Sequence, residues 1–230
     1  MTNVKAGVEY KINLEDKSFL LDRKKYKLLD NINTSGSITE AAILTGISYR
    51  TALNHIDKIE DSLGIEIVNS KKGGHGGGGN TSLSEEGFSI LKECKKINAI
   101  MELHRYVNEI EGTVKKIDPS KGIMIIKMKD IEINIPLKKN YAIGDKILAL
   151  INYDNIFLML EPQESSIRNV IKGNIVELSL KNNIIRVKID IGGINIFCDV
   201  TVSAEKELGL DLGKEIYVGF KAMSVATLKL

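Results

Sequence analysis

The spacing of the hydrophobic residues changes along the chain, and this change constrains the fold more than any other feature. Before Glu111, apolar residues recur at steps of three and four, which indicates helices. After Gly112 they alternate with polar residues or form short runs between turns, which indicates strands. The sequence therefore predicts an α+β protein of several domains, with the main boundary at residues 111 and 112.

Composition narrows the class of protein. The 230 residues are 43% hydrophobic, which is enough for two or three domains with buried cores. The formal net charge is only +2, so any binding to nucleic acid has to come from a local basic face. Cys94 and Cys198 lie far apart and outside any C-x-x-C pattern, which argues against a zinc site or a disulfide scaffold. No secretion signal or long apolar run is evident, so we expect a cytoplasmic protein without a membrane span.

Two short helices separated by a glycine turn are predicted in the N-terminal part. Ser37 and Glu40 have the spacing of a capping box, which predicts a helix start at Ser37. Gly46 supplies the left-handed residue that commonly ends a helix. Ser48 can then cap a second helix, whose buried face would consist of Ala52, Leu53, Ile56 and Ile59.

The polar face of the second helix is a candidate DNA-binding surface, because such a helix fits the major groove and presents polar side chains to base edges. Arg50 could read guanine and Asn54 could pair with adenine. A glycine-rich stretch with two lysines follows, and its composition is typical of a wing that contacts phosphates. The candidate DNA-binding residues are Ser48, Tyr49, Arg50, Thr51, Asn54, His55, Lys58, Lys71 and Lys72. The alternative is a helical hairpin with a solvated face, followed by a disordered linker.

The rest of the chain contains a long helix and an internal repeat. A helix is predicted from about residue 84 to 111, and its apolar stripe would pair with a second copy of the chain in a homodimer. Beyond it, Gly112-Thr-Val aligns with Gly173-Asn-Ile, and Gly144-Asp-Lys-Ile aligns with Gly213-Lys-Glu-Ile. Each copy reads as five short strands, which favours two small β-barrel modules over residues 112–163 and 164–230.

The N-terminal pattern resembles a known family. The stretch GSITEAAILTGISYRTALNHIDKIE, the glycine-rich segment after it and SLSEEG resemble the DNA-binding domain of the ModE family of molybdate-responsive regulators. The resemblance covers roughly residues 5 to 110. It implies that residues 1–111 form a winged helix-turn-helix domain with a dimerisation helix.

The second copy of the repeat resembles the molybdate-binding modules of the Mop or TOBE type. Ser166-Ile167-Arg168-Asn169, followed by Gly173, is similar to the Ser-Ala-Arg-Asn signature of those OB-like barrels. The resemblance implies an oxyanion site between modules, with Ser166 and Arg168 on one side and Thr201 and Lys221 on the other. Its expected ligands are Ser166, Arg168, Asn169, Thr201, Ser203, Lys221 and Ala222.

The chemistry of this residue set suits a tetrahedral dianion. Hydroxyls, backbone N–H groups and cations can all donate to its oxygens, so no lone pair has to face the ligand. The first copy lacks the set, since Asn152-Tyr153 stands where the second copy has Lys221-Ala222.

These features together predict a transcription regulator. We expect a homodimer that binds double-stranded operator DNA, takes molybdate or tungstate as its effector and controls genes for oxyanion uptake or the molybdenum cofactor. One alternative is an oxyanion storage or buffering protein, and another is a regulator whose barrels serve only to dimerise. An enzyme is not expected, because no nucleophile set, catalytic carboxylate pair or nucleotide loop is evident, and no site for a metal cation is expected either.

Overall fold

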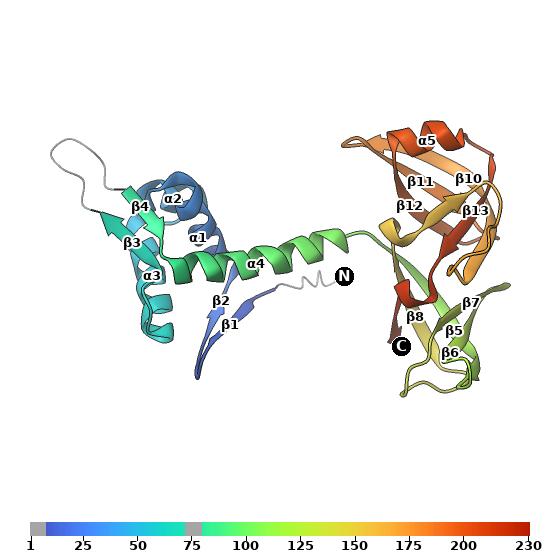
Figure 1. The fold of residues 1–230 in the computed structure, drawn as a ribbon, viewed down its shortest axis with the longest axis horizontal. Coiled ribbons are helices and arrows are strands. Elements are labelled where there is room, and N and C mark those ends of the chain that lie inside the picture. The colour runs from blue at the N-terminus through green and yellow to red at the C-terminus, as the bar shows by residue number, and fades with distance from the viewer. Residues whose placement is uncertain (1–7, 72–79) are drawn as a thin grey trace, which may run out of the picture. The chain divides into compact units, whose positions relative to one another are not determined.

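The fold is that of a computed structural model, which describes residues 8–71 and 80–230. The chain divides into two compact units between Glu102 and Leu103, called unit 1 and unit 2 (Figure 1). Within the described residues, no helix is long and apolar enough to cross a membrane. In the same ranges, no group of three or more His, Cys, Asp or Glu side chains could hold a metal ion.

Unit 1 contains two β-hairpins and four helices. The first hairpin is antiparallel and precedes three helices, and the second hairpin leads into a long helix. The elements are β1 (Tyr10–Leu14), β2 (Lys17–Leu21), α1 (Arg23–Ser35), α2 (Ile38–Thr45), α3 (Tyr49–Leu63), β3 (Val68–Lys71), β4 (Asn80–Leu83) and α4 (Glu85–Leu103).

The helix boundaries in unit 1 follow from local signals. The Ser37 hydroxyl accepts a hydrogen bond from the Glu40 N–H at 3.3 Å and begins α2. Gly46, with φ of 73°, ends α2, and the Ser48 hydroxyl accepts from the Thr51 N–H at 3.1 Å to begin α3. The predicted pair of helices is therefore confirmed. Three of the four residues predicted to be buried on α3 are buried, and the fourth, Leu53, is half-buried.

The long helix is shorter than predicted. It ends at Leu103 rather than near residue 111, because β5 (Val107–Asp118) begins four residues later. The first residues of β5 pair with β8, from Val107 opposite Asn152 to Thr113 opposite Lys146. Val107 and Ile110 fit a helical stripe in sequence, but these hydrogen bonds to a distant strand place them in a sheet. Unit 2 accordingly begins at Leu103, ahead of the predicted boundary.

Unit 2 consists of two five-stranded antiparallel sheets that carry the internal repeat. Each copy contributes five strands in the same order. The first copy contains β5, β6 (Ile123–Met128), β7 (Ile131–Pro136), β8 (Lys146–Asn152), the 3-10 turn η1 (Tyr153–Asn155) and β9 (Phe157–Met159). The second contains β10 (Asn169–Lys181), β11 (Ile184–Asp190), β12 (Asn195–Thr201), α5 (Val202–Leu208), β13 (Glu215–Phe220), the 3-10 turn η2 (Ala222–Ser224) and β14 (Val225–Lys229).

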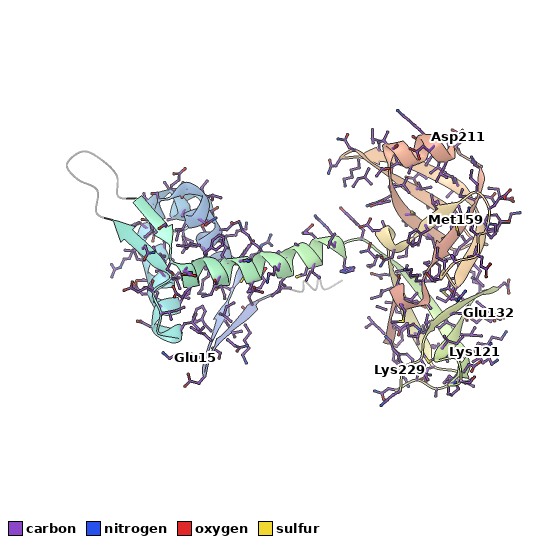
Figure 2. All side chains as sticks on the ribbon, in the orientation of Figure 1. Glu15, Lys121, Glu132, Met159, Asp211 and Lys229 are labelled. Atoms are coloured by element: carbon purple, nitrogen blue, oxygen red, sulfur yellow. The ribbon has the colours of Figure 1, made fainter. Side chains whose placement is uncertain are left out.

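The last strand of each copy belongs to the sheet of the other copy. The strand orders are β14-β8-β5-β6-β7 and β9-β13-β10-β11-β12. Met159 of β9 pairs with Tyr217 of β13, and Lys229 of β14 pairs with Ile147 of β8. Figure 2 labels Met159 and Lys229. The two repeats are thus interlocked and share one continuous hydrophobic core, instead of forming two separate modules.

Two asparagines at equivalent positions of the repeat join the sheets. Buried Asn108, near the start of β5, accepts from the Phe197 N–H at 2.7 Å and donates to the Phe197 carbonyl at 2.9 Å. Buried Asn169, at the start of β10, does the same with Asn134, at 2.6 and 2.9 Å. Each amide therefore satisfies backbone groups on an edge strand of the opposite sheet, which buried polar groups require.

We predict that Asn108→Ala destabilises unit 2. The change leaves the buried backbone groups around Phe197 without their partner, which should lower the free energy of unfolding by about 2 kcal/mol. Urea denaturation followed by circular dichroism measures this loss. Asn174→Ala is the control, because Asn174 is exposed on β10, and an equal loss in both variants would contradict the assignment.

Candidate functional site

The N-terminal part of α3 presents a polar face. Tyr49, Arg50, Asn54 and Lys58 are exposed, whereas Thr51 and His55 are half-buried. The Thr51 hydroxyl lies 2.8 Å from that of Ser48, so both hydroxyls are engaged at the helix cap. Burial and then the charge of Lys25 lower the pKa of His55, which keeps its imidazole neutral at pH 7. Arg50, Asn54 and Lys58 are the exposed nitrogen donors on this face, and Tyr49 adds an exposed hydroxyl.

The predicted wing corresponds to the segment between β3 and β4. These strands pair antiparallel, from Val68 opposite Leu83 to Lys71 opposite Asn80. Lys71 is the last residue of β3, and Lys72 lies outside the described residues. The hairpin arms thus match the expectation, and the placement of the two lysine side chains stays a prediction.

Five of the seven expected oxyanion ligands, including Asn169, lie at one end of the second sheet. Asn169 pairs with Phe220, so Arg168 and Lys221 directly continue two neighbouring strands at the same edge. Ser166 precedes Arg168, and Ala222 begins η2 directly after Lys221. Arg168 donates to the Ser165 carbonyl at 3.1 Å. Within the described ranges, the side chains of Ser166 and Lys221 have no hydrogen-bond partner, and neither Arg168 nor Lys221 is in an ion pair.

Asn169, which was expected to bind the oxyanion, has a structural role in unit 2. Its side chain is only 3% exposed, and both ends of its amide bind the backbone of Asn134. An amide held in this way has its oxygen and one N–H already used. Its second N–H is the only donor left for a ligand.

Thr201 and Ser203 lie at the opposite end of the sheet. Thr201 pairs with Ile184, which pairs with Lys181 at the far end of β10. Because β10 has 13 residues, its ends are separated by roughly 40 Å of strand path. The Thr201 hydroxyl caps α5 by accepting from the Ala204 N–H at 3.1 Å, and the Ser203 hydroxyl donates to Glu207 at 2.7 Å. Lys221 therefore lies beside Arg168 and not beside Thr201, unlike the expected grouping.

A cluster that the sequence reasoning missed occupies the equivalent position in the first repeat. We call it the aromatic cluster, and it consists of Tyr106, Tyr153, Arg186, Phe197 and Asp199. The rings of Tyr106 and Tyr153 stack at 5.9 Å, and those of Tyr153 and Phe197 at 5.4 Å. The Arg186 guanidinium lies 4.2 Å from the Tyr106 ring centre and 4.8 Å from that of Tyr153. Two hydrogen bonds of 2.8 Å join Arg186 to Asp199.

The electrostatics of the aromatic cluster are those of a neutralised pair. The hydrogen bonds that Arg186 donates to the Asp199 carboxylate raise the pKa of Arg186, and burial raises the pKa of Tyr153. Aligning Gly112 with Gly173 also aligns Tyr106 with Ile167 and Asn108 with Asn169. This alignment was the one sequence signal that could have indicated the cluster.

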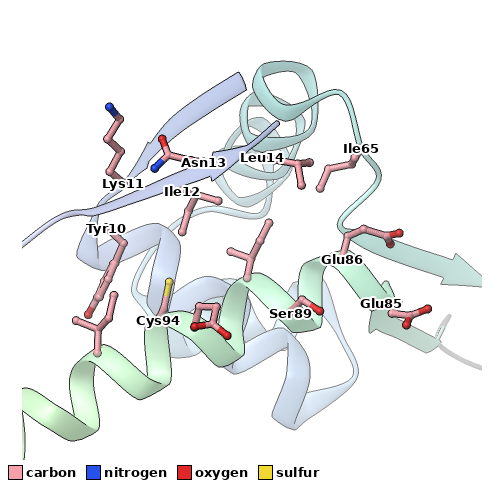
Figure 3. A pocket seen from close by; sticks show the side chains of 13 residues that line it. Tyr10, Lys11, Ile12, Asn13, Leu14, Ile65, Glu85, Glu86, Ser89 and Cys94 are labelled. Atoms are coloured by element: carbon pink, nitrogen blue, oxygen red, sulfur yellow. The ribbon is translucent and has the colours of Figure 1, made fainter. Parts of the chain in front are cut away.

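A large cavity lies in unit 1, away from every expected site residue. It measures about 580 Å³ and is formed between β1 and α4 (Figure 3). Ile12 and Leu14 line one side, Ile90 and Cys94 the other, with acidic residues near the start of α4 at its edge. Its wall is mainly apolar, so it is poorly suited to a dianion, which requires several hydrogen-bond donors.

Neither cysteine is suited to be a nucleophile. Burial raises the pKa of Cys94 to about 11 and that of Cys198 to about 12. We predict that both thiols resist a disulfide reagent at pH 8 in the native protein and react fully in denaturant. Spectrophotometric thiol titration measures this, and rapid labelling of the native protein would contradict it.

Comparisons with known proteins agree with this organisation. Residues 165–227 match the TOBE domain family. The chain is 25% identical to the molybdenum transport protein ModE of Azotobacter vinelandii, over 89% of this chain and 91% of ModE. Over 52% of this chain, it is 28% identical to the molybdate/tungstate import ATP-binding protein WtpC of Pyrococcus abyssi. The chain spans only 32% of WtpC, about a third of that relative.

A solved structure is also similar in part. The cytoplasmic molybdate-binding protein ModG, with molybdate bound, matches 52% of this chain and 94% of its own chain, with 22% identity and a TM-score of 0.46. The resemblance to ModE extends through both units.

Proposed function

We propose that this ModE-type protein is a cytoplasmic transcription regulator that binds operator DNA and senses molybdate or tungstate. Its target genes would serve oxyanion uptake or the molybdenum cofactor. Two observations support the proposal: a resemblance to ModE over 89% of the chain, and a TOBE match that contains the candidate ligands.

The oxyanion role depends above all on two unpaired cations. Arg168 and Lys221 continue adjacent strands, and neither has a carboxylate partner within the described ranges. Two neighbouring cations repel each other, so a bound dianion would stabilise them by charge-assisted hydrogen bonds. The hydroxyl of Ser166 and the backbone N–H groups at Ala222 would complete this half of the site.

The position of Thr201 supports a homodimer in which a second copy of the chain would supply the other half. Within one copy, Thr201 and Ser203 lie at the far end of β10, and a single oxyanion cannot bridge that separation. Large exposed hydrophobics flank both ends, with Met223 79% exposed near Lys221 and Leu180 66% exposed near Thr201. In a symmetric homodimer, the Arg168 end of each copy would meet the Thr201 end of the other.

We predict that Arg168→Ala abolishes oxyanion binding without unfolding the protein. Arg168 is exposed, and its one hydrogen bond is local, so its loss should cost little stability. Isothermal titration calorimetry with molybdate, tungstate and sulfate measures the effect. Lys172→Ala removes an equal charge four residues away and should bind normally, since Lys172 is paired with Glu215. Unchanged binding by Arg168→Ala would overturn the assignment.

The DNA-binding role is assigned to α3 and the β3–β4 hairpin, as a winged helix-turn-helix. Its support is the capped α2–α3 pair and the polar, exposed N-terminal face of α3. Arg50 and Asn54 would contact base edges, and Lys58, Lys71 and Lys72 would contact phosphates. The last turns of α4 expose Ile97, Ile100, Met101 and Leu103, which supports a dimer that places two such helices on one operator.

We predict that Arg50→Ala weakens binding to the DNA upstream of the protein's own gene by about tenfold or more, as expected for a lost base contact. Fluorescence anisotropy at fixed salt measures the affinity. Lys27→Ala, an exposed charge on α1, is the matched control. Equal DNA affinity of the two variants would contradict the assignment of α3 to the DNA interface.

An oxyanion storage protein is the second candidate, and the TOBE match over residues 165–227 is what favours it. Storage would give the α2–α3 pair no role. A protein that binds molybdate but shows no preference for its own upstream DNA over unrelated DNA would favour storage.

A further inference from the structure

The segment before the first strand of each repeat and the loop after its fourth strand contact each other differently in the two repeats. In the second repeat, the segment before β10 and the loop at Lys221 make no side-chain hydrogen bond to each other within the described residues. In the first repeat, the counterparts are in direct contact. The Tyr153 N–H donates to the Tyr106 carbonyl at 3.1 Å, and the two rings stack. The two segments are therefore joined by direct contacts in the first repeat, whereas the second repeat has no side-chain hydrogen bond between its counterparts among the described residues.

The closed loop holds the segment that leads from α4 into β5. The Asn152 side-chain amide donates to the Leu103 carbonyl at 2.6 Å. That carbonyl belongs to the last turn of α4, where backbone acceptors lack partners within the helix. Asn152 is 6% exposed, and its oxygen accepts from the Asp154 N–H at 2.8 Å. Residues 103–106 are thus fixed at both ends to the loop after β8.

The aromatic cluster also adjoins the Thr201 end of the second sheet. Asp199 and Thr201 are two residues apart on β12, so their side chains leave the same face of the strand. Arg186 and Ile184 on β11 are their respective partners. Asp199 and Thr201 are about 7 Å apart along β12. A ligand on Thr201 would therefore lie one strand period from the Arg186–Asp199 pair.

We propose that the aromatic cluster transmits oxyanion binding from Thr201 to the segment Leu103–Tyr106, and this inference rests on the proposed function. The cluster is not itself an oxyanion site, because Asp199 already neutralises Arg186 and leaves both side chains mostly buried, at 10% and 24% exposed. Rings and ion pair form one contiguous set of contacts, which is the kind of connection that can carry coupling between sites.

The absence of tryptophan from the sequence makes a direct test possible. Tyr106→Trp keeps an aromatic ring beside Arg186 and introduces a single tryptophan, whose emission can be excited apart from that of the remaining tyrosines. We expect its emission to change on titration with molybdate or tungstate and to saturate at the midpoint measured by calorimetry. Phe88→Trp, on an exposed part of α4 in unit 1, is the control and should not respond in the absence of DNA.

Two further variants separate transmission from binding. In the Tyr106→Trp protein, Asp199→Asn breaks the ion pair, and Tyr153→Leu removes the stacking ring. Each should leave binding detectable by calorimetry and abolish most of the emission change, and circular dichroism checks that each is folded. Arg168→Ala should abolish both signals.

The outcomes distinguish the two proposals. Heat of binding without any change in emission at position 106 would overturn transmission and leave the oxyanion role intact. An unchanged emission response in both cluster variants would overturn it as well. The lack of any heat with molybdate, tungstate or sulfate would overturn the proposed function and this inference together.

Discussion

The exchange of the last strands between the two repeats is the constraint on which unit 2 depends. β9 completes the second sheet and β14 the first, so neither copy contains all five strands of its own sheet. The buried side chains consequently form one core, and Asn108 and Asn169 lock each sheet to an edge strand of its neighbour. Partial unfolding of one repeat would expose the core of both, which favours cooperative unfolding of the whole unit.

The exchange also decides where the chemistry can occur. The loop that leads into each exchanged strand passes close to the opposite sheet, so η1 contacts β12 and η2 contacts β7. The backbone plan is the same at both places, and only the side chains differ. Lys221 and Arg168 leave one place cationic and open, whereas Tyr153 and Tyr106 leave the other filled and neutral. The two repeats therefore share one topology but carry different side chains at these two loops.

Unit 1 is organised by local interactions to a greater degree. Ser37 and Ser48 satisfy the first N–H groups of α2 and α3, and Gly46 allows the tight turn between them. These signals act within a few residues, which is why the two helices and their buried faces could be predicted from sequence. The end of α4 could not be predicted in the same way. Val107 and Ile110 satisfy a helical period as well as a strand period, and pairing with β8 decides between them.

Local patterns were enough to predict the capped helices and the internal repeat, and the resemblance to the TOBE type supplied the candidate ligands. The predicted boundary between helical and strand regions lay too late in the chain, because pairing with β8 decides where the strands begin. Tertiary structure alone decided how those ligands are grouped. Lys221 lies beside Arg168 because Phe220 pairs with Asn169 at the start of β10. Thr201 is far from both because the other end of β10 pairs with β11, the neighbour of β12. The tertiary structure also decided that the Asn169 amide binds the Asn134 backbone and that the Arg186 guanidinium stacks on the Tyr106 ring. The physical reason is distance along the chain: caps and periods act over a few residues, whereas these contacts join residues that no local pattern relates.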